Sequence, residues 1–128
     1  MKILLDTHAF LWAISDDGRL SMTVRDAVID PSNEVFVSAA SSWEISIKYG
    51  LGKLSLPSPP DRYLPAQRSR AGLELLAIGE PEVCRVHQLP SVHRDPFDRL
   101  LVAQANCYGM LLATDDAIMD RYPVGVLW

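Results

Sequence analysis

The sequence predicts a parallel α/β sandwich, and three features of the chain lead to that expectation. Short apolar runs, which read as buried strands, alternate with segments of helical character along the 128 residues. The apolar content of 48% suits a folded core and argues against disorder. No internal repeat or low-complexity segment interrupts the pattern. We therefore expect a single domain over residues 1–128, built on a mainly parallel sheet of four to five short strands.

The first half of the chain is expected to contribute two strands and four helices. Turn residues separate them, with 16–19 following the first helix and 30–33 stopping the second. Three prolines between residues 57 and 60 form a rigid connector, and Pro65 suits the next helix only within its first turn. The expected strands are residues 2–5 and 35–37, and the expected helices are residues 6–14, 21–29, 41–50 and 61–71.

The second half of the chain is expected to contribute three strands and three helices. The clearest helix begins at Pro96, because proline is favoured at the first helical position, and it ends before Gly109. Thr114 is expected to cap the last helix, with Asp115 and Asp116 in its first turn. The expected strands are residues 74–78, 110–113 and 125–128, and the expected helices are residues 81–86, 96–108 and 115–122.

Charge and hydropathy narrow the classes of function. The net charge of −4 argues against a nucleic-acid binder, which usually carries a basic surface. Metal ions bound by clustered acids would soften that objection, as would the basic residues expected near them, which are Arg94, Arg99, Lys48 and Lys53. No apolar run approaches the roughly 20 residues that span a bilayer. The acid at position 6 comes too early for the core of a signal peptide, so we expect a cytoplasmic protein without a membrane segment.

Four acids recur near the ends of the apolar runs or at the starts of helices. They are Asp6, Glu44, Asp98 and Asp116. The carboxyl ends of parallel strands share one edge of a sheet, where ligands bind. Four carboxylates gathered there would repel one another, and a hard divalent cation with oxygen ligands relieves that repulsion. The pattern therefore predicts a Mg²⁺ or Mn²⁺ site and phosphodiester chemistry.

Helix capping is the competing explanation for each acid taken singly. Asp6 can cap the helix that follows it, and Ser41-x-x-Glu44 has the spacing of a capping box. Asp95 suits a cap, and Asp98 suits the positive end of the helix dipole. Redundancy favours a metal site, because these helix starts carry more acids than capping requires. The chain also lacks a glycine-rich phosphate loop or an activated serine or cysteine nucleophile.

Four segments of the chain resemble the PIN-domain ribonucleases, and among them the toxins of VapBC toxin–antitoxin pairs. The segments occur in the family's order and spacing, and the third is the most specific. They are Leu4-Leu5-Asp6-Thr7-His8-Ala9, Ser42-Trp43-Glu44-Ile45, His93-Arg94-Asp95-Pro96-Phe97-Asp98-Arg99 with its continuation to Ala105, and Thr114-Asp115-Asp116. The resemblance implies a PIN-like three-layer α/β/α sandwich. It also implies a metal-dependent endoribonuclease that acts as a toxin and uses Mg²⁺ or Mn²⁺.

The same resemblance implies the partners of the protein. These are an RNA substrate, a cognate VapB-like antitoxin, and a second copy of the chain in a homodimer, with toxin and antitoxin joined in a hetero-oligomer. An arginine of the antitoxin entering the acidic groove would be physically sensible. Two rival functions stay open. One is a receiver-type phosphoacceptor domain that also binds Mg²⁺, and the other is a PIN-fold binding module without activity.

The four acids receive separate roles in this hypothesis. Asp6 and Asp98 bind the main metal, and Asp116 binds it directly or through water. Glu44 orients or deprotonates the attacking water, or joins a second metal. The choice of Asp116 over Asp115 rests on the Thr-x-Asp spacing.

The resemblance also covers residues around the acids. Thr7 and Thr114 match polar positions of the family, and Asp95 is a feature of a subfamily. Arg94 and Arg99 either contact substrate phosphates or belong to a solvated or ion-paired helix end, where Arg99 could satisfy Asp95 or Asp116. Outside the four acids, His93 is placed to pin the loop before Asp95.

Overall fold

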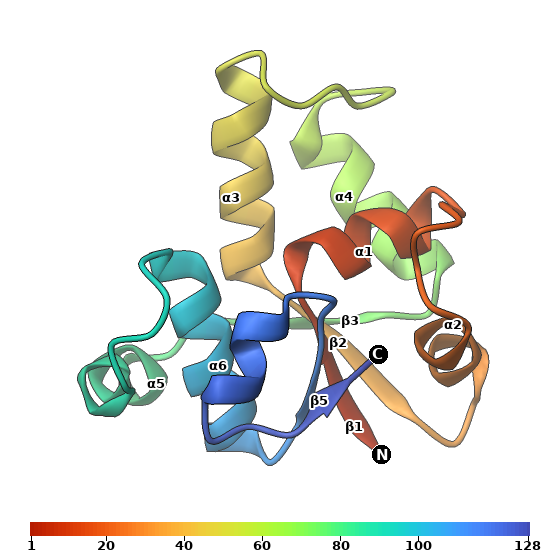
Figure 1. The fold of residues 1–128 in the computed structure, drawn as a ribbon. Coiled ribbons are helices and arrows are strands. Elements are labelled where there is room, and N and C mark those ends of the chain that lie inside the picture. The colour runs from red at the N-terminus through yellow and green to blue at the C-terminus, as the bar shows by residue number, and fades with distance from the viewer.

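A single parallel sheet of five strands lies at the centre of the computed structural model, which describes residues 1–128 (Figure 1). The strand order is β3-β2-β1-β4-β5, and every neighbouring pair is parallel. The strands are β1 Lys2–Leu5, β2 Glu34–Ser38, β3 Glu74–Leu76, β4 Leu111–Ala113 and β5 Val126–Leu127. The predicted parallel α/β fold with four to five short strands is therefore confirmed.

Six α-helices and two 3₁₀ helices connect these strands. The α-helices are α1 Thr7–Ile14, α2 Met22–Ile29, α3 Ala39–Gly50, α4 Pro60–Arg70, α5 Glu80–Arg85 and α6 Pro96–Tyr108. The 3₁₀ helices are η1 Val86–Gln88 and η2 Ala117–Arg121. No helix combines the length and the apolar character that crossing a bilayer requires.

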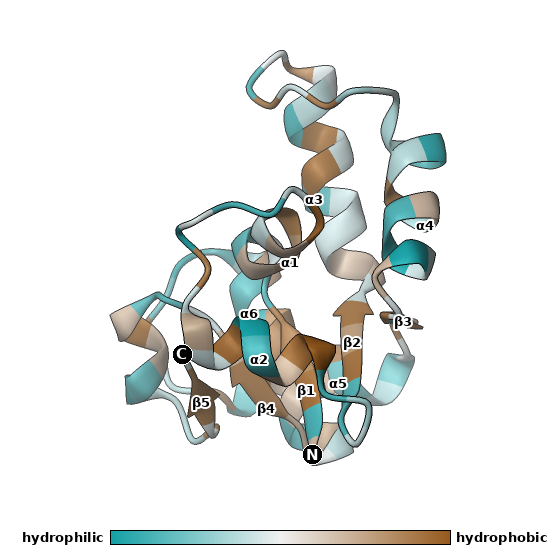
Figure 2. Ribbon diagram, turned by 90° about the vertical axis from the view of Figure 1, so that its right-hand side faces the viewer, coloured by the Kyte–Doolittle hydropathy of each residue, from teal (hydrophilic) through white to brown (hydrophobic).

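Alternation of side chains along β1 creates the three layers. Ile3 and Leu5 belong to a core with Phe10 of α1 and Val24 of α2. Leu4 points to the opposite face and belongs to a second core with residues of α6 and η2. Burial on both faces explains why the central strands are almost purely apolar, as their brown colour shows (Figure 2).

The helix after β2 begins earlier than the sequence predicts. Ser38, the last residue of β2, caps α3 by accepting a hydrogen bond from the backbone N–H of Ala40 at 3.0 Å. Ser41 therefore lies inside the helix, and the expected capping box with Glu44 is wrong. The side chain of Glu44 is consequently available for other contacts.

Three other expectations about local structure need correction. The last helix is a short 3₁₀ helix, η2, and Asp116 caps it in place of Thr114 by accepting from the N–H of Ile118. The third strand ends at Leu76, two residues early. Pro65 lies in the second turn of α4 and not in the first. The helix continues through it, and the neighbouring Leu64 is buried in the core.

Candidate functional site

A small polar cleft lies at the carboxyl edge of the sheet and holds all four predicted acids. Its volume is about 120 Å³, and none of its lining residues is hydrophobic. Those residues are Asp6, Thr7, His8, Glu44, Lys48, Asp95, Asp98, Asp115 and Asp116. A cavity of about 410 Å³ elsewhere on α1 is larger, but only its edge residue His8 is shared with the acidic cleft. The acidic cleft is therefore the candidate catalytic site, because all four predicted acids line it.

Strand pairing brings the first and last acids together. Leu5 of β1 pairs with Ala113 of β4, and the backbone N–H of Asp6 donates to the carbonyl of Ala113 at 3.0 Å. Asp6 directly follows β1, and Asp116 lies three residues after β4. The parallel register therefore places two acids that are 110 residues apart in sequence at one edge of the sheet.

Asp6 combines capping with a position in the cleft. One carboxylate oxygen accepts from the backbone N–H of Ala9 at 2.8 Å, which caps α1. The residue is only 6% exposed. Burial raises the pKa of the Asp6 carboxyl, although hydrogen bonds from Thr114 and from the N–H of Ala9 oppose that rise. The capping explanation for Asp6 is correct, but it does not remove the carboxylate from the cleft.

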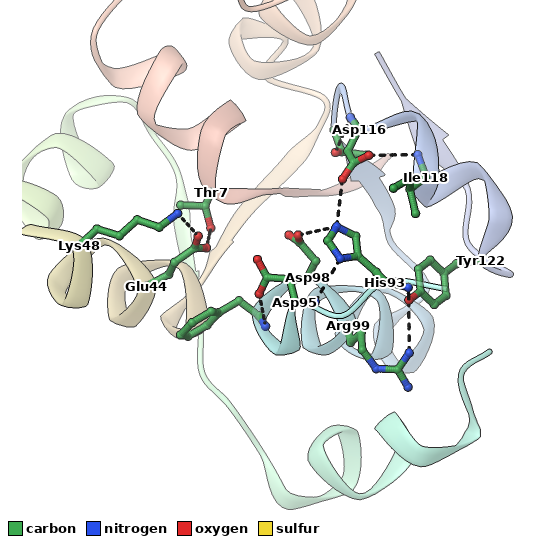
Figure 3. A network of polar contacts seen from close by, with 12 residues as sticks. Thr7, Glu44, Lys48, His93, Asp95, Asp98, Arg99, Asp116, Ile118 and Tyr122 are labelled. Atoms are coloured by element: carbon green, nitrogen blue, oxygen red, sulfur yellow. Dashed lines mark hydrogen bonds and ion pairs between the residues drawn. The ribbon is translucent and has the colours of Figure 1, made fainter. Parts of the chain in front are cut away.

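Glu44 is held by a hydroxyl on one side and an ammonium on the other. Its Oε1 accepts from the Thr7 hydroxyl at 2.7 Å, and its Oε2 accepts from Lys48 Nζ at 2.6 Å (Figure 3). The hydrogen bond to Glu44 raises the pKa of Lys48, and the charges of Asp95 and Asp98 add to the effect. Lys48 is one of the basic residues expected near the acids, and its spacing four residues after Glu44 on α3 also indicates the pair.

Asp98 and Asp116 share contacts with His93. The distance from His93 Nε2 is 3.2 Å to Asp98 Oδ2 and 3.1 Å to Asp116 Oδ2 (Figure 3). One ligand atom of each of these three residues lies within 4.8 Å of the others. Asp115 lines the same cleft but is not part of this cluster. Asp116 is therefore better placed than Asp115 to share a cation with Asp98.

The pKa of Asp98 reports the crowding of negative charge. Burial, followed by the charge of Asp95, raises the pKa of Asp98 to about 7. Asp6 and Glu44 contribute to the same rise, and His93 opposes it. The raised pKa of Asp98 therefore reflects its burial first and the negative charge of the neighbouring acids second.

The donor set fits a hard divalent cation. Every candidate ligand in the cleft is a carboxylate oxygen, apart from the hydroxyl of Thr7 and the rings of His8 and His93. Oxygen donors of this kind suit Mg²⁺ and Mn²⁺, whereas no cysteine is present to favour a softer metal. Binding such an ion would relieve the charge that raises the pKa of Asp98.

Asp95 and its neighbours fix the start of α6. The Asp95 carboxylate accepts from the backbone N–H of Phe97 at 2.9 Å, which confirms the predicted cap. Phe97 packs edge-on against Trp43 of α3, with 5.0 Å between the ring centroids. These contacts join the first turn of α6 to α3 and so place Asp98 opposite Glu44 across the cleft.

The two predicted arginines do not enter the cleft. Arg94 is exposed, and it is not among the residues that line the acids. Arg99 donates to the carbonyl oxygens of Pro90 at 2.8 Å and Val86 at 3.2 Å. The expectation that Arg99 pairs with Asp95 or Asp116 is therefore wrong, because backbone carbonyls of the preceding loop occupy its guanidinium.

The sequence pattern and this arrangement agree with a known protein family. The profile of the PIN domain matches residues 3–125, which is almost the whole chain. The chain belongs to the PIN-domain family. The recognition of a PIN domain from the four sequence segments is therefore confirmed.

The chain is also similar in sequence to a curated relative. The relative is Ribonuclease VapC16 of Mycobacterium tuberculosis (strain ATCC 25618 / H37Rv), 44% identical over 54 residues. That match covers 42% of this chain and 38% of VapC16, so the chain spans about two fifths of that relative's length.

The similar structures support the PIN fold. The crystal structure of VapBC2 from Rickettsia felis, bound to a DNA fragment from its promoter, has a TM-score of 0.73. The two sequences are 18% identical, and the match covers 98% of this chain and 97% of the Rickettsia felis chain. DNA-bound VapBC from Salmonella typhimurium has a TM-score of 0.68 at 20% identity, covering 98% of this chain and 96% of its own.

Proposed function

We propose that this PIN domain is a metal-dependent endoribonuclease, the toxin of a toxin–antitoxin pair, which hydrolyses RNA phosphodiester bonds. The observation that supports this most is the single polar cleft in which Asp6, Glu44, Asp98 and Asp116 meet. Partial similarity to a protein named Ribonuclease VapC16 supports the same reaction class. The receiver-type alternative finds less support, because the lysine of the cleft is paired with Glu44 on the same helix and does not follow a late strand.

Three carboxylates would hold the cation in this proposal. They are Asp6, Asp98 and Asp116, all of them lining the cleft. When bound, Mg²⁺ or Mn²⁺ supplies positive charge for the phosphoryl oxygens and lowers the pKa of an attacking water. Positioning of the attacking water and contact with the substrate would depend on other side chains of the protein.

Glu44 is the side chain best suited to direct the attacking water. Its two oxygens are fixed by Thr7 and by Lys48, so the carboxylate has one orientation at the edge of the cleft. A positioned carboxylate can accept a proton from water as it attacks phosphorus. Lys48 carries a positive charge on the same edge, where it can approach a substrate phosphate. Arg94 is a further candidate for phosphate contact because it is exposed next to Asp95.

A cleavage assay tests the proposal. Purified protein is incubated with a mixed RNA substrate in Mg²⁺, in Mn²⁺ and in excess chelator, and the products are resolved by electrophoresis. Cleavage should require the divalent ion and should fall at least about 100-fold in Asp98→Asn. Asp26→Asn, on the exposed face of α2, is the matched control and should cleave normally. Equal cleavage by Asp98→Asn and the wild-type protein would contradict the role of Asp98. No cleavage by the wild-type protein would favour a binding module without activity.

Partner proteins form the second half of the proposal. The similar structures from Rickettsia felis and Salmonella typhimurium are of VapBC complexes, which supports a VapB-like antitoxin for this chain. Trp43 and Ile47 of α3, and Leu51 directly after the helix, are exposed and lie four residues apart, so they form one apolar stripe at this face of α3. Such a stripe supports contact with a second copy of the chain or with an antitoxin. The cytoplasmic location stays a prediction.

The stripe can be tested directly. Sedimentation of the wild-type protein should show a dimer, and Leu51→Glu should weaken it because a charge enters an apolar contact. Co-expression with the product of the neighbouring gene should give a stable complex. A wild-type chain that sediments as a monomer and copurifies with nothing would contradict both partners.

A further inference from the structure

His93 makes three side-chain contacts that together determine where its proton lies. The backbone N–H of Asp95 donates to Nδ1 at 3.1 Å. On the other side of the ring, Nε2 is 3.2 Å from Asp98 Oδ2 and 3.1 Å from Asp116 Oδ2. The ring therefore joins the loop before α6, the first turn of α6 and the residue that caps η2 (Figure 3).

The contact with Asp95 selects one tautomer of the ring. A backbone N–H can only donate, so Nδ1 accepts this hydrogen bond through its lone pair. In the neutral imidazole the proton then resides on Nε2, where two carboxylate oxygens can accept it. The opposite tautomer would set an N–H against the N–H of Asp95 and a lone pair against two carboxylates.

We propose that His93 is a positioning residue of the metal centre and not a metal ligand. Its Nε2–H would donate to Asp98 and Asp116 and so fix the positions of these two carboxylates. The proposal rests on the proposed function of the cleft. Nε2 has no free lone pair for a cation while Nδ1 accepts from Asp95. Carboxylates that bind metals are commonly oriented by hydrogen-bond donors behind them, and such donors tune the affinity for the metal.

The backbone around His93 is anchored in a way that fits this role. The N–H of His93 donates to the Tyr122 hydroxyl at 2.8 Å, and Arg99 also donates to that hydroxyl at 3.3 Å. Arg99 further holds the carbonyls of Pro90 and Val86. The loop that carries His93 is thus attached to the end of η2 and to η1. This gives Arg99 a role in the His-x-Asp-Pro-Phe-Asp-Arg segment that does not involve substrate.

Nuclear magnetic resonance of ¹⁵N-labelled protein tests the tautomer. Long-range ¹H–¹⁵N spectra distinguish a protonated ring nitrogen from one with a lone pair, and His93→Gln assigns the signal among the three histidines. We expect Nδ1 with a lone pair and Nε2 protonated, both in chelator and in saturating Mg²⁺. A proton on Nδ1 in chelator, or the loss of the Nε2 proton when Mg²⁺ binds, would overturn the proposal.

Mn²⁺ binding, followed by electron paramagnetic resonance of the free ion, tests the positioning. His93→Ala should weaken binding about tenfold or more, as loss of an orienting partner commonly does. His93→Gln keeps an N–H donor and should recover most of the affinity. His87→Ala, an exposed histidine on η1, should bind as the wild type does. Equal affinity of His93→Ala and the wild type would contradict the role, as would failure of His93→Gln to exceed His93→Ala.

These measurements separate this inference from the proposed function. Neither measurement uses RNA, so a protein that shows the expected tautomer and Mn²⁺ affinities but cleaves nothing would sink only the ribonuclease proposal. Conversely, active enzyme with Nε2 bound to the cation would remove His93 as a donor and leave the ribonuclease proposal intact. Thermal unfolding of each variant shows whether it has kept its fold.

Discussion

At Asp98, folding buries a carboxyl group that metal binding would require to be ionised. Packing at the start of α6 buries its carboxyl among other acids, and the pKa rises to about 7 from an ordinary value of 3.8. Between about pH 4 and pH 7 the folded chain therefore holds a proton that the unfolded chain has released. The free energy of unfolding must fall as pH rises through that window, since the folded state binds more protons.

This sign gives a stability prediction for the protein in chelator. Urea unfolding should show stability decreasing from pH 4.5 to pH 8, by at most about 4 kcal/mol, because each pKa unit corresponds to about 1.4 kcal/mol. Asp98→Asn should flatten the dependence and be the more stable protein at pH 8. Asp26→Asn, which is exposed, should keep the wild-type slope. Stability that rises over this range would contradict the burial of an uncompensated acid.

Lys48 is the second residue whose role can be isolated. It is about 43% exposed, so its ion pair with the buried Glu44 should contribute only about 1 kcal/mol to stability. Its effect on cleavage should be larger, because it fixes one oxygen of Glu44 and brings positive charge into the cleft. Lys48→Met should lower kcat/KM about 10–100-fold. Lys2→Met makes the same change at the opposite end of β1, and a matching loss there would show a general charge effect.

The elements that could be predicted from sequence are those whose signals are local. The strand over residues 2–5 and the helix over residues 96–108 match closely, because apolar runs, a proline start and a glycine end act within a few residues. Gly109 indeed adopts φ 64°, where a side chain would be strained. The start of α3 differs from the prediction because Ser38 and Ser41 are both good caps, and only strand pairing decides where β2 stops.

The same distinction applies to the site. Chain order and strand–helix alternation were enough to predict that four acids gather, since parallel strands share one edge. They could not predict that His93 lies between Asp98 and Asp116. Those contacts depend on side-chain directions and on the path of the loop after η1. Arg99 illustrates the limit, since its neighbours in sequence are acids but its partners in space are carbonyls.

Capping and catalytic electrostatics can be separated at the start of α6. Asp95 caps the helix and also raises the pKa of Asp98 through its charge. Asp95→Asn keeps an acceptor for the N–H of Phe97 but removes the charge. Asp95→Asn should keep the wild-type free energy of unfolding at pH 5. The midpoint of the pH dependence of that free energy should move to lower pH, because the pKa of Asp98 falls. Asp95→Ala should move the midpoint equally and lose about 1 kcal/mol as well, because the cap is gone. Equal stability of the two variants would show that the cap contributes nothing.

At the scale of the whole molecule, the acidic cleft gathers segments that lie far apart in the sequence. Its acids come from the end of β1, from α3, from α6 and from the loop after β4. Without a cation, these carboxylates repel one another within the cleft. A cation bound by several of them therefore opposes separation of the sheet from α6, and binding to the folded state alone must stabilise the entire fold.

Thermal unfolding measures that coupling. At 100 times its dissociation constant, Mg²⁺ or Mn²⁺ should add about 2.7 kcal/mol, which for a chain of this size raises the melting temperature by roughly 10 °C. At a fixed metal concentration the increase should be larger at pH 8 than at pH 5, because protons compete for Asp98. Asp6→Asn and Asp116→Asn should each reduce it, whereas Asp26→Asn should not. A shift of equal size in all variants would mean that the ion binds elsewhere on this acidic chain, since only a shared site makes distant carboxylates act as one.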